Sequence, residues 1–139
     1  MIAQPSTVLF ACVHNAGRSQ MAAAIFTMLA DYARARAMSA GTRPLDRVHP
    51  EVVDVMAEIG IDLSAAKPRV LTEGLAREAR LLVTMGCGEE CPYVPGLTVV
   101  DWAIPDPKGR PADDVRVIRE TIQAFVVELL RAHGWERDR

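Results

Sequence analysis

"TVLFACVHNAGRSQMAAAIF", residues 7–26, joins a short apolar run to a helical pattern through a loop of a few residues. Residues 7–11 have the composition of a strand that is buried on both faces. Over residues 18–37 the apolar side chains recur at the spacing of an amphipathic helix. A strand that leads directly into a helix is typical of a βαβ unit, so this stretch predicts a parallel sheet covered by helices.

The rest of the chain continues the same alternation of strands and helices. Strands are expected at 37–41, 80–85 and 96–102, and helices at 50–60, 69–79 and 112–134. The last residues, from 132 onward, are expected to form a frayed helix end. We therefore predict an α/β fold with three αβα layers around a four-stranded parallel sheet, formed by a single domain over residues 1–139.

Charge and hydropathy exclude several classes of protein. The 139-residue chain has a net charge of −2, with both signs scattered along it, which argues against a nucleic-acid or membrane-surface binder. Its apolar stretches are shorter than the ~20 residues that a membrane span needs. The N-terminus lacks the pattern of a secretory signal, which predicts a cytoplasmic protein with mostly reduced thiols. No apolar excess requires a dimer, so we expect a monomer.

The loop over residues 12–18 has the features of an anion site. Successive backbone N–H groups between a strand and a helix N-terminus can bind a tetrahedral oxyanion, helped by the helix dipole. Gly17 allows the turn, Arg18 offers a planar fork for two oxygens, and Ser19 has a hydroxyl near the sulfur. The positive electrostatic potential of these N–H groups, the helix dipole and Arg18 also favours the thiolate form of Cys12, which predicts a nucleophile. The alternative is a buried thiol beside an unrelated surface arginine.

Cys87 and Cys91 follow an expected strand and stand four residues apart among glycine and proline residues, which indicates a mobile loop. A flexible separation of this length can bring two Cα atoms within about 7 Å, so the pair can form a disulfide. Zinc is an alternative, but it would need further ligands and none stands nearby. Two inert buried thiols are the other alternative.

Asp106 precedes Pro107 shortly after the last expected strand. Because proline favours an extended backbone in the residue before it, Asp106 can point from a loop toward the anion site. It is therefore the candidate general acid. The alternative is that the Asp-Pro pair only makes a turn, and Asp101 is interpreted as the end of the strand.

Three motifs together resemble a known family. "CVHNAGRSQMA", residues 12–22, is similar to the active-site loop of the low-molecular-weight protein tyrosine phosphatase fold, and more closely to its arsenate reductase branch. "VTMGCGEECP" and "DWAIPDPKG" also resemble the reductases. The phosphatase-like loops often read Asn-Ser-Cys-Arg, whereas this chain has Ala16 and Gly17 at the two middle positions.

The resemblance implies roles for the residues of this loop. The oxyanion is expected to lie against six of them, namely Val13, His14, Asn15, Ala16, Gly17 and Arg18. Asn15 is expected to brace the loop internally, and Ser19 to form a hydrogen bond with the Cys12 sulfur. Arg18 and Ser19 thus act together with Cys12 in catalysis.

The reaction implied by the resemblance is the reduction of arsenate to arsenite, a detoxification of arsenic, with no cofactor and no metal. Cys12 attacks arsenate, and Asp106 protonates the departing oxygen. Cys87 then attacks Cys12, arsenite leaves, and Cys91 resolves the mixed disulfide to leave a Cys87–Cys91 disulfide.

Thioredoxin is the electron donor that the resemblance implies, with mycothiol or glutathione and glutaredoxin as alternatives. Phosphate and sulfate are expected to inhibit as analogues of arsenate. A second hypothesis is a phosphatase that hydrolyses phosphate monoesters through a Cys12 phosphocysteine, and a third is a domain that only binds oxyanions. The Cys87 and Cys91 pair favours the reductase over the phosphatase, and Cys12 together with Asp106 counts against a binding domain.

Overall fold

The structure is a computed structural model that describes residues 4–87, 91 and 94–138. Its elements follow in the order β1 (Ser6–Cys12), α1 (Arg18–Leu29), β2 (Ala35–Gly41), α2 (Pro50–Ala57), α3 (Glu73–Arg77), β3 (Leu81–Thr84), β4 (Thr98–Asp101) and α4 (Ala112–His133). The predicted α/β class is confirmed. In the part of the chain that the structure describes, no helix combines the length and the apolar character needed to cross a bilayer.

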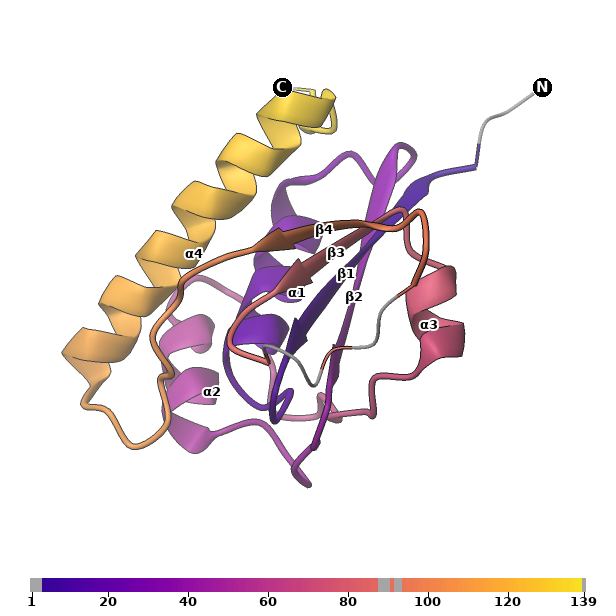
Figure 1. Ribbon diagram of the computed structural model, residues 1–139. Coiled ribbons are helices and arrows are strands. Elements are labelled where there is room, and N and C mark those ends of the chain that lie inside the picture. The colour runs from indigo at the N-terminus through magenta and orange to yellow at the C-terminus, as the bar shows by residue number, and fades with distance from the viewer. Residues whose placement is uncertain (1–3, 88–90, 92–93, 139) are drawn as a thin grey trace.

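The sheet has four strands in the order β2-β1-β3-β4, and each neighbouring pair is parallel. β1 is central, with Cys12 opposite Gly41 of β2 and Ala11 opposite Thr84 of β3. Because all strands run the same way, their carboxyl ends share one edge of the sheet, where ligands bind in folds of this kind (Figure 1). The predicted four-stranded parallel sheet is confirmed.

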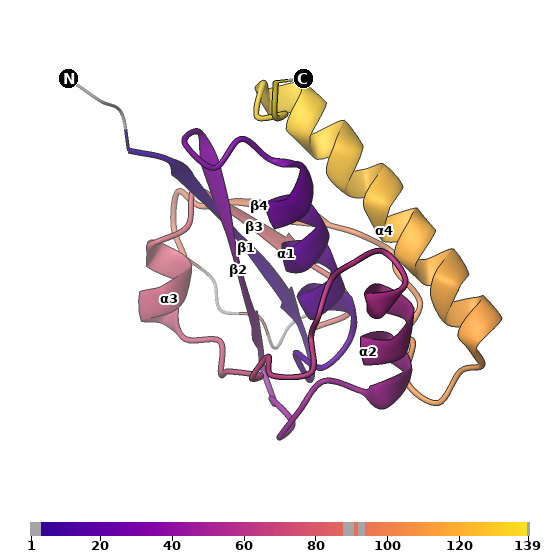
Figure 2. The same ribbon diagram turned by 180° about the vertical axis from the view of Figure 1, so that it is seen from behind.

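Helices cover both faces of the sheet, which gives the three predicted layers. α1, α2 and α4 lie on one face and α3 on the other (Figures 1 and 2). Successive side chains of β1 alternate between the two layers, as expected for a strand. Phe10 and Cys12 belong to the core on the α1 side, whereas Leu9 and Ala11 belong to the core on the α3 side.

Trp102 packs in the core on the α1 side. It is 5% exposed, and its ring lies 5.7 Å from Phe10 and 5.1 Å from Phe125, measured between ring centroids. A large aromatic side chain at this depth stabilises the connection that follows β4. The segment from Trp102 to Asp106 is therefore held against the sheet.

The first helix is shorter than its periodicity predicts. α1 ends at Leu29, and Ala30 has an extended backbone. Residues 35–37, which the pattern assigns to the helix, instead pair with residues 6–8 of β1. Alanine and arginine are good helix formers, so here the parallel pairing with the central strand outweighs local propensity.

The expectation of a frayed C-terminus is wrong. α4 ends with Gly134 in the left-handed conformation, a common helix cap. Trp135 is only 6% exposed and packs edge-on against Phe26 at 6.3 Å, and its carbonyl accepts a hydrogen bond from the backbone N–H of Asp31. Burial of an indole ring at this point attaches the chain end to α1.

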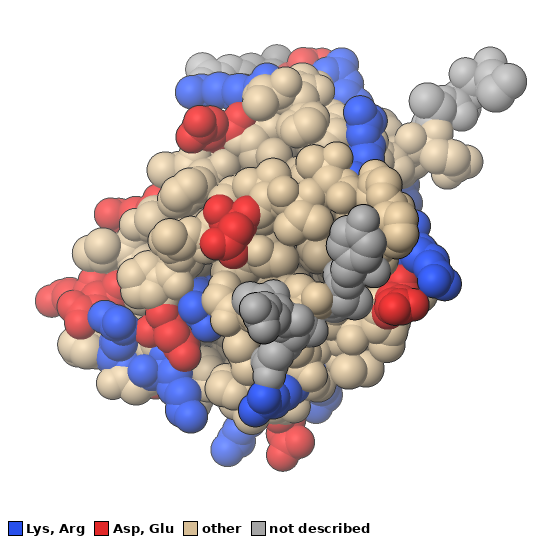
Figure 3. All heavy atoms as spheres, viewed as in Figure 1, with Lys and Arg blue, Asp and Glu red and all other residues tan. Residues whose placement is uncertain are grey.

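The edge strand β4 is exposed along its length. Val99 and Val100 are 54% and 37% exposed. The part of the surface over β4 carries few charged side chains, whereas several Lys and Arg side chains gather toward the bottom of the same view (Figure 3). β4 contains four residues, and such a short edge strand offers little length for pairing with another chain.

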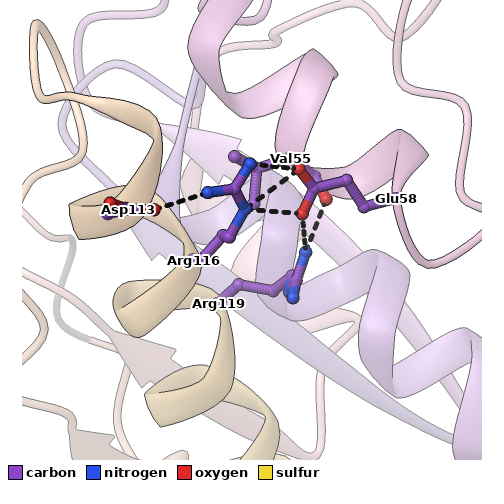
Figure 4. A network of polar contacts seen from close by, with 5 residues as sticks. All are labelled: Val55, Glu58, Asp113, Arg116 and Arg119. Carbon is purple, nitrogen blue, oxygen red and sulfur yellow. Dashed lines mark hydrogen bonds and ion pairs between the residues drawn. The ribbon is translucent and has the colours of Figure 1, made fainter.

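A network of ionic hydrogen bonds joins α2 to α4 (Figure 4). Glu58, which follows α2, accepts hydrogen bonds from Arg116 and Arg119 of α4 at 2.8 Å each. Arg119 also donates to the backbone carbonyl of Val55 at 2.8 Å, and Arg116 contacts Asp113. The hydrogen bonds from Arg116 and then Arg119 lower the pKa of Glu58 from its usual 4.5 to about 2.

We expect Glu58→Gln to lower the melting temperature at neutral pH. A carboxyl whose pKa is lower in the folded state stabilises the fold above its unfolded pKa, and this stabilisation is lost as the pH falls through the folded pKa. The difference between wild type and variant should therefore shrink between about pH 5 and about pH 2. Glu73→Gln is the control, because the ion pair of Glu73 with Arg77 is exposed and lies within α3. If the difference in melting temperature between wild type and Glu58→Gln stayed the same at low pH, the role assigned to Glu58 would be wrong.

Candidate active site

The loop between β1 and α1 turns its carbonyl groups away from its centre. Five carbonyl groups accept hydrogen bonds from backbone N–H groups outside residues 12–18, the pairs being Cys12 with Thr42, Val13 with Arg43, His14 with Leu45, Ala16 with His49 and Gly17 with Met21. Among the described residues, none of the backbone N–H groups of 13–17 donates to a protein acceptor. Because α1 has no side-chain cap either, this concave set of donors suits a tetrahedral oxyanion.

A chain of buried hydrogen bonds runs to the sulfur of Cys12. Asn15 Nδ2 donates to Ser19 Oγ at 2.7 Å, and Ser19 Oγ lies 2.9 Å from Cys12 Sγ. Since the Ser19 oxygen already accepts from Asn15, its own hydrogen is available to the sulfur. A hydrogen bond donated to the sulfur holds it in a fixed position, and the thiolate is the nucleophilic form of a cysteine.

Asn15 holds the loop from inside. It is fully buried, and its backbone has a φ of 49°, a left-handed conformation that asparagine tolerates better than most residues. Its Oδ1 accepts hydrogen bonds from Gln20 Nε2 at 3.3 Å and from the backbone N–H of Arg69 at 3.0 Å. The side-chain amide therefore ties the loop to α1 and to the segment before α3.

Arg18, the first residue of α1, is half-buried. Its Nη1 donates to the backbone carbonyl of Ile104 at 3.1 Å. This bond links the anion loop to the segment that carries Asp106. A guanidinium held there is a cation with further donors for an oxyanion.

The segment with Asp106 lies against the anion loop through Pro107. A Cβ atom at Gly17 would be 2.8 Å from Pro107 Cγ, so only glycine allows this approach. Asp106 is half-buried, and its Oδ1 accepts from the backbone N–H of Lys108 at 3.0 Å. Asp101, by contrast, is the last residue of β4, and its Oδ1 accepts from Thr84 Oγ1 at 2.7 Å.

His49 is part of this site, although in the sequence it only precedes the helix expected over residues 50–60. It is the N-cap residue of α2, it is 9% exposed, and it donates its backbone N–H to the carbonyl of Ala16. Burial lowers the pKa of His49, while the carboxylates of Glu51 and Asp106 act in the opposite direction. The lowered pKa favours a neutral imidazole beside the anion loop at neutral pH.

Cys87 and Cys91 form a disulfide, with their Cα atoms 5.8 Å apart. The alternative of two inert thiols is therefore wrong. Cys87 is 4% exposed and packs in the core on the α3 side, so in this state it lies across the sheet from Cys12. The predicted mobility of the loop falls largely on residues 88–90 and 92–93, which lie outside the described residues.

The structure thus brings Cys12, Ser19 and Arg18 together in one loop, with Asp106 on the neighbouring segment. Cys87 and Cys91 are joined to each other, and Cys87 packs in the core on the other side of the sheet from that of Cys12. Within the described residues, no group of three or more His, Cys, Asp or Glu side chains could hold a metal ion. A cysteine inside an anion-binding loop, between the central strand of a parallel sheet and its helix, defines a phosphatase-like class of protein.

The chain belongs to the low molecular weight phosphotyrosine protein phosphatase family, whose sequence pattern matches residues 7–138. It is 40% identical over 128 residues to a Halobacterium salinarum protein provisionally named an arsenate reductase, with 86% of this chain and 87% of that protein covered.

Solved structures agree. A thioredoxin-dependent arsenate reductase of Corynebacterium glutamicum is 36% identical, with a TM-score of 0.80 over 95% of this chain and 63% of the other. The chain therefore spans less than two thirds of that protein. An arsenate reductase in the phosphate binding state is 27% identical, with a TM-score of 0.77 over 91% of this chain and 98% of the other. The predicted resemblance to the arsenate reductases is confirmed.

Proposed function

We propose that this protein is an arsenate reductase that uses the Cys12 thiol as nucleophile and Cys87 with Cys91 as a dithiol relay. The observation that carries the proposal is the disulfide between Cys87 and Cys91 in a chain that also holds a thiol inside an anion-binding loop. Reduction of arsenate to arsenite takes two electrons, and a dithiol releases two electrons when it becomes a disulfide. Hydrolysis of a phosphate ester takes none.

The first step forms a bond between sulfur and arsenic. Arsenate lies against the N–H groups of residues 13–18 and the Arg18 guanidinium, and the Cys12 thiolate attacks the arsenic atom. Asp106 gives its proton to the departing oxygen, which leaves as water. The approach of Pro107 to Gly17 supports this role, because it brings the Asp106 segment against the anion loop.

The next steps move the electrons. The Cys87 thiolate attacks the Cys12 sulfur, the bond from sulfur to arsenic breaks, and its electron pair stays on arsenic, which leaves as arsenite. Cys91 then attacks the Cys87 sulfur of the mixed disulfide and returns Cys12 as a thiolate. The disulfide between Cys87 and Cys91 is the product state, and it matches the form that the structure describes.

Cys87 has to cross from the α3 side of the sheet to reach Cys12. It does so in the reduced state, when no bond joins it to Cys91. The loop that carries Cys87 is therefore proposed to open more readily than the sheet. We infer that breakage of the disulfide releases Cys87 for this movement.

The electron donor is proposed to be a dithiol protein of the thioredoxin type. Mycothiol, or glutathione with glutaredoxin, is the alternative donor. The reducing cytoplasm is the compartment in which such donors operate. Phosphate and sulfate, which share the tetrahedral shape and charge of arsenate, are proposed to compete for the anion loop. A monomeric single domain over residues 1–139 contains every group that the scheme uses.

The test is NADPH consumption with arsenate in three parallel assays, which contain thioredoxin and its reductase, glutaredoxin with glutathione, or the mycothiol system. We expect arsenate-dependent oxidation of NADPH, with one arsenite formed per NADPH, in the thioredoxin assay. Turnover in another assay alone would change the donor but keep the reaction. Hydrolysis of a phosphate monoester without arsenate turnover in any assay would favour the phosphatase and overturn the proposal.

A further inference from the structure

Gly86 lies at the point where the chain leaves β3 and reaches Cys87. Its φ is +88°, a left-handed conformation that glycine adopts readily. The side of Gly86 on which any other residue carries its Cβ atom faces the guanidinium of Arg18. A Cβ atom built there would lie 2.7 Å from Arg18 Nη1 and 3.2 Å from both Cζ and Nη2.

This contact is with the charged end of Arg18. All three atoms that approach Gly86 belong to the guanidinium, and Nη1 is also the atom that donates to the carbonyl of Ile104 at 3.1 Å. The guanidinium is thus confined between the end of β3 and the segment that leads to Asp106. A long side chain loses considerable rotamer entropy when it is fixed, so a preformed space on each side matters for its orientation.

We propose that Gly86 is a positioning residue, whose missing side chain sets the direction of the Arg18 guanidinium toward a bound oxyanion. The inference rests on the proposed function only in that residues 12–18 bind an oxyanion. It also gives the segment before Cys87 a second role, because the residue that precedes the relay cysteine orients the cation of the anion loop.

The chain contains a matched control for this contact. Gly96 lies in the same connection between β3 and β4 and has a φ of +82°, but nothing lies within 4 Å of a Cβ atom built there. Alanine therefore strains the backbone similarly at Gly86 and at Gly96, whereas it meets Arg18 only at Gly86. Any difference between the two variants reports on the guanidinium.

The experiment measures the affinity of the oxidised protein for inorganic phosphate by calorimetry, together with KM and kcat for arsenate. We expect Gly86→Ala to weaken phosphate binding about tenfold, the order of effect of one charge-assisted hydrogen bond, and to raise KM more than it lowers kcat. Gly96→Ala should change the phosphate affinity and the KM for arsenate by less than about twofold. It should lower the melting temperature by about as much as Gly86→Ala does. Phosphate binding needs no redox chemistry, so a failure of arsenate turnover would leave this test intact.

Action through Arg18 is tested by a double-mutant cycle. Arg18→Lys should weaken phosphate binding by itself, and Gly86→Ala added to it should then cost less than about threefold. If Gly86→Ala does not fold, Gly86→Asn and Gly96→Asn replace the alanine pair, because asparagine tolerates a positive φ. Equal effects at positions 86 and 96, or additive effects of the Arg18 and Gly86 changes, would overturn the proposal.

Discussion

Cys12→Ser is expected to reduce arsenate turnover by about 10³-fold or more while the protein still folds. A serine hydroxyl is a far weaker nucleophile than a thiolate, and it cannot form the disulfide that releases arsenite. The oxygen should accept the same hydrogen bond from Ser19 that the sulfur receives at 2.9 Å. The measurement is arsenite release with thioredoxin, thioredoxin reductase and NADPH.

Binding of inorganic phosphate to the same variant is the control. The N–H groups of residues 13–17 and the Arg18 guanidinium are unchanged, so phosphate affinity should stay within a few-fold of wild type. If the serine variant retained a tenth or more of the turnover, a thiol other than Cys12 would be the nucleophile. If phosphate affinity and turnover were lost together, the loop would have collapsed and the variant would have to be replaced by Cys12→Ala.

Cys91→Ser is expected to stop multiple turnover but to leave one round of the reaction. Cys87 can still attack Cys12 and release about one arsenite per chain, after which a Cys12–Cys87 disulfide remains without a partner to resolve it. The measurement is arsenite release by the reduced variant, first without a donor and then with thioredoxin as the only source of thiols. Hydrolysis of a small phosphate monoester, where wild type has it, should be unaffected.

Cys87→Ser is the matched variant for this experiment. It removes the other member of the same disulfide, but it also removes the group that attacks Cys12, so no arsenite should be released even in the first round. A difference between the two variants assigns the order of the relay. Unchanged turnover of Cys91→Ser with thioredoxin would show that the order as assigned is wrong.

The order of elements and the place of the anion loop are predictable because their signals are local. An apolar run, a glycine and a helical pattern lie within residues 7–26, and the torsions they favour are the ones observed. The limits of the elements are less predictable. Residues 35–37 belong to β2 because they pair with β1, and Trp135 is buried because it packs against Phe26. In both cases the partner lies far away in the sequence, so local patterns do not indicate the contact.

The same distinction applies to the candidate site. Cys12, Arg18 and Ser19 lie within one local motif, so their meeting can be foreseen from spacing. His49 and Gly86 enter the site through contacts with residues far along the chain, and a histidine before a proline or a glycine beside a cysteine has several more common explanations. His49 is revealed by its hydrogen bond to the carbonyl of Ala16, and Gly86 by its place beside Arg18, where β3 packs next to β1.

The place of Cys91 in the fold has a kinetic consequence. Cys91 packs at the border of the core on the α3 side and is partly exposed, so a protein that reduces the disulfide would have to approach this surface. Val13 of the anion loop packs against the same core. We therefore expect an oxyanion in the loop and a reductant at the disulfide to compete for neighbouring surface.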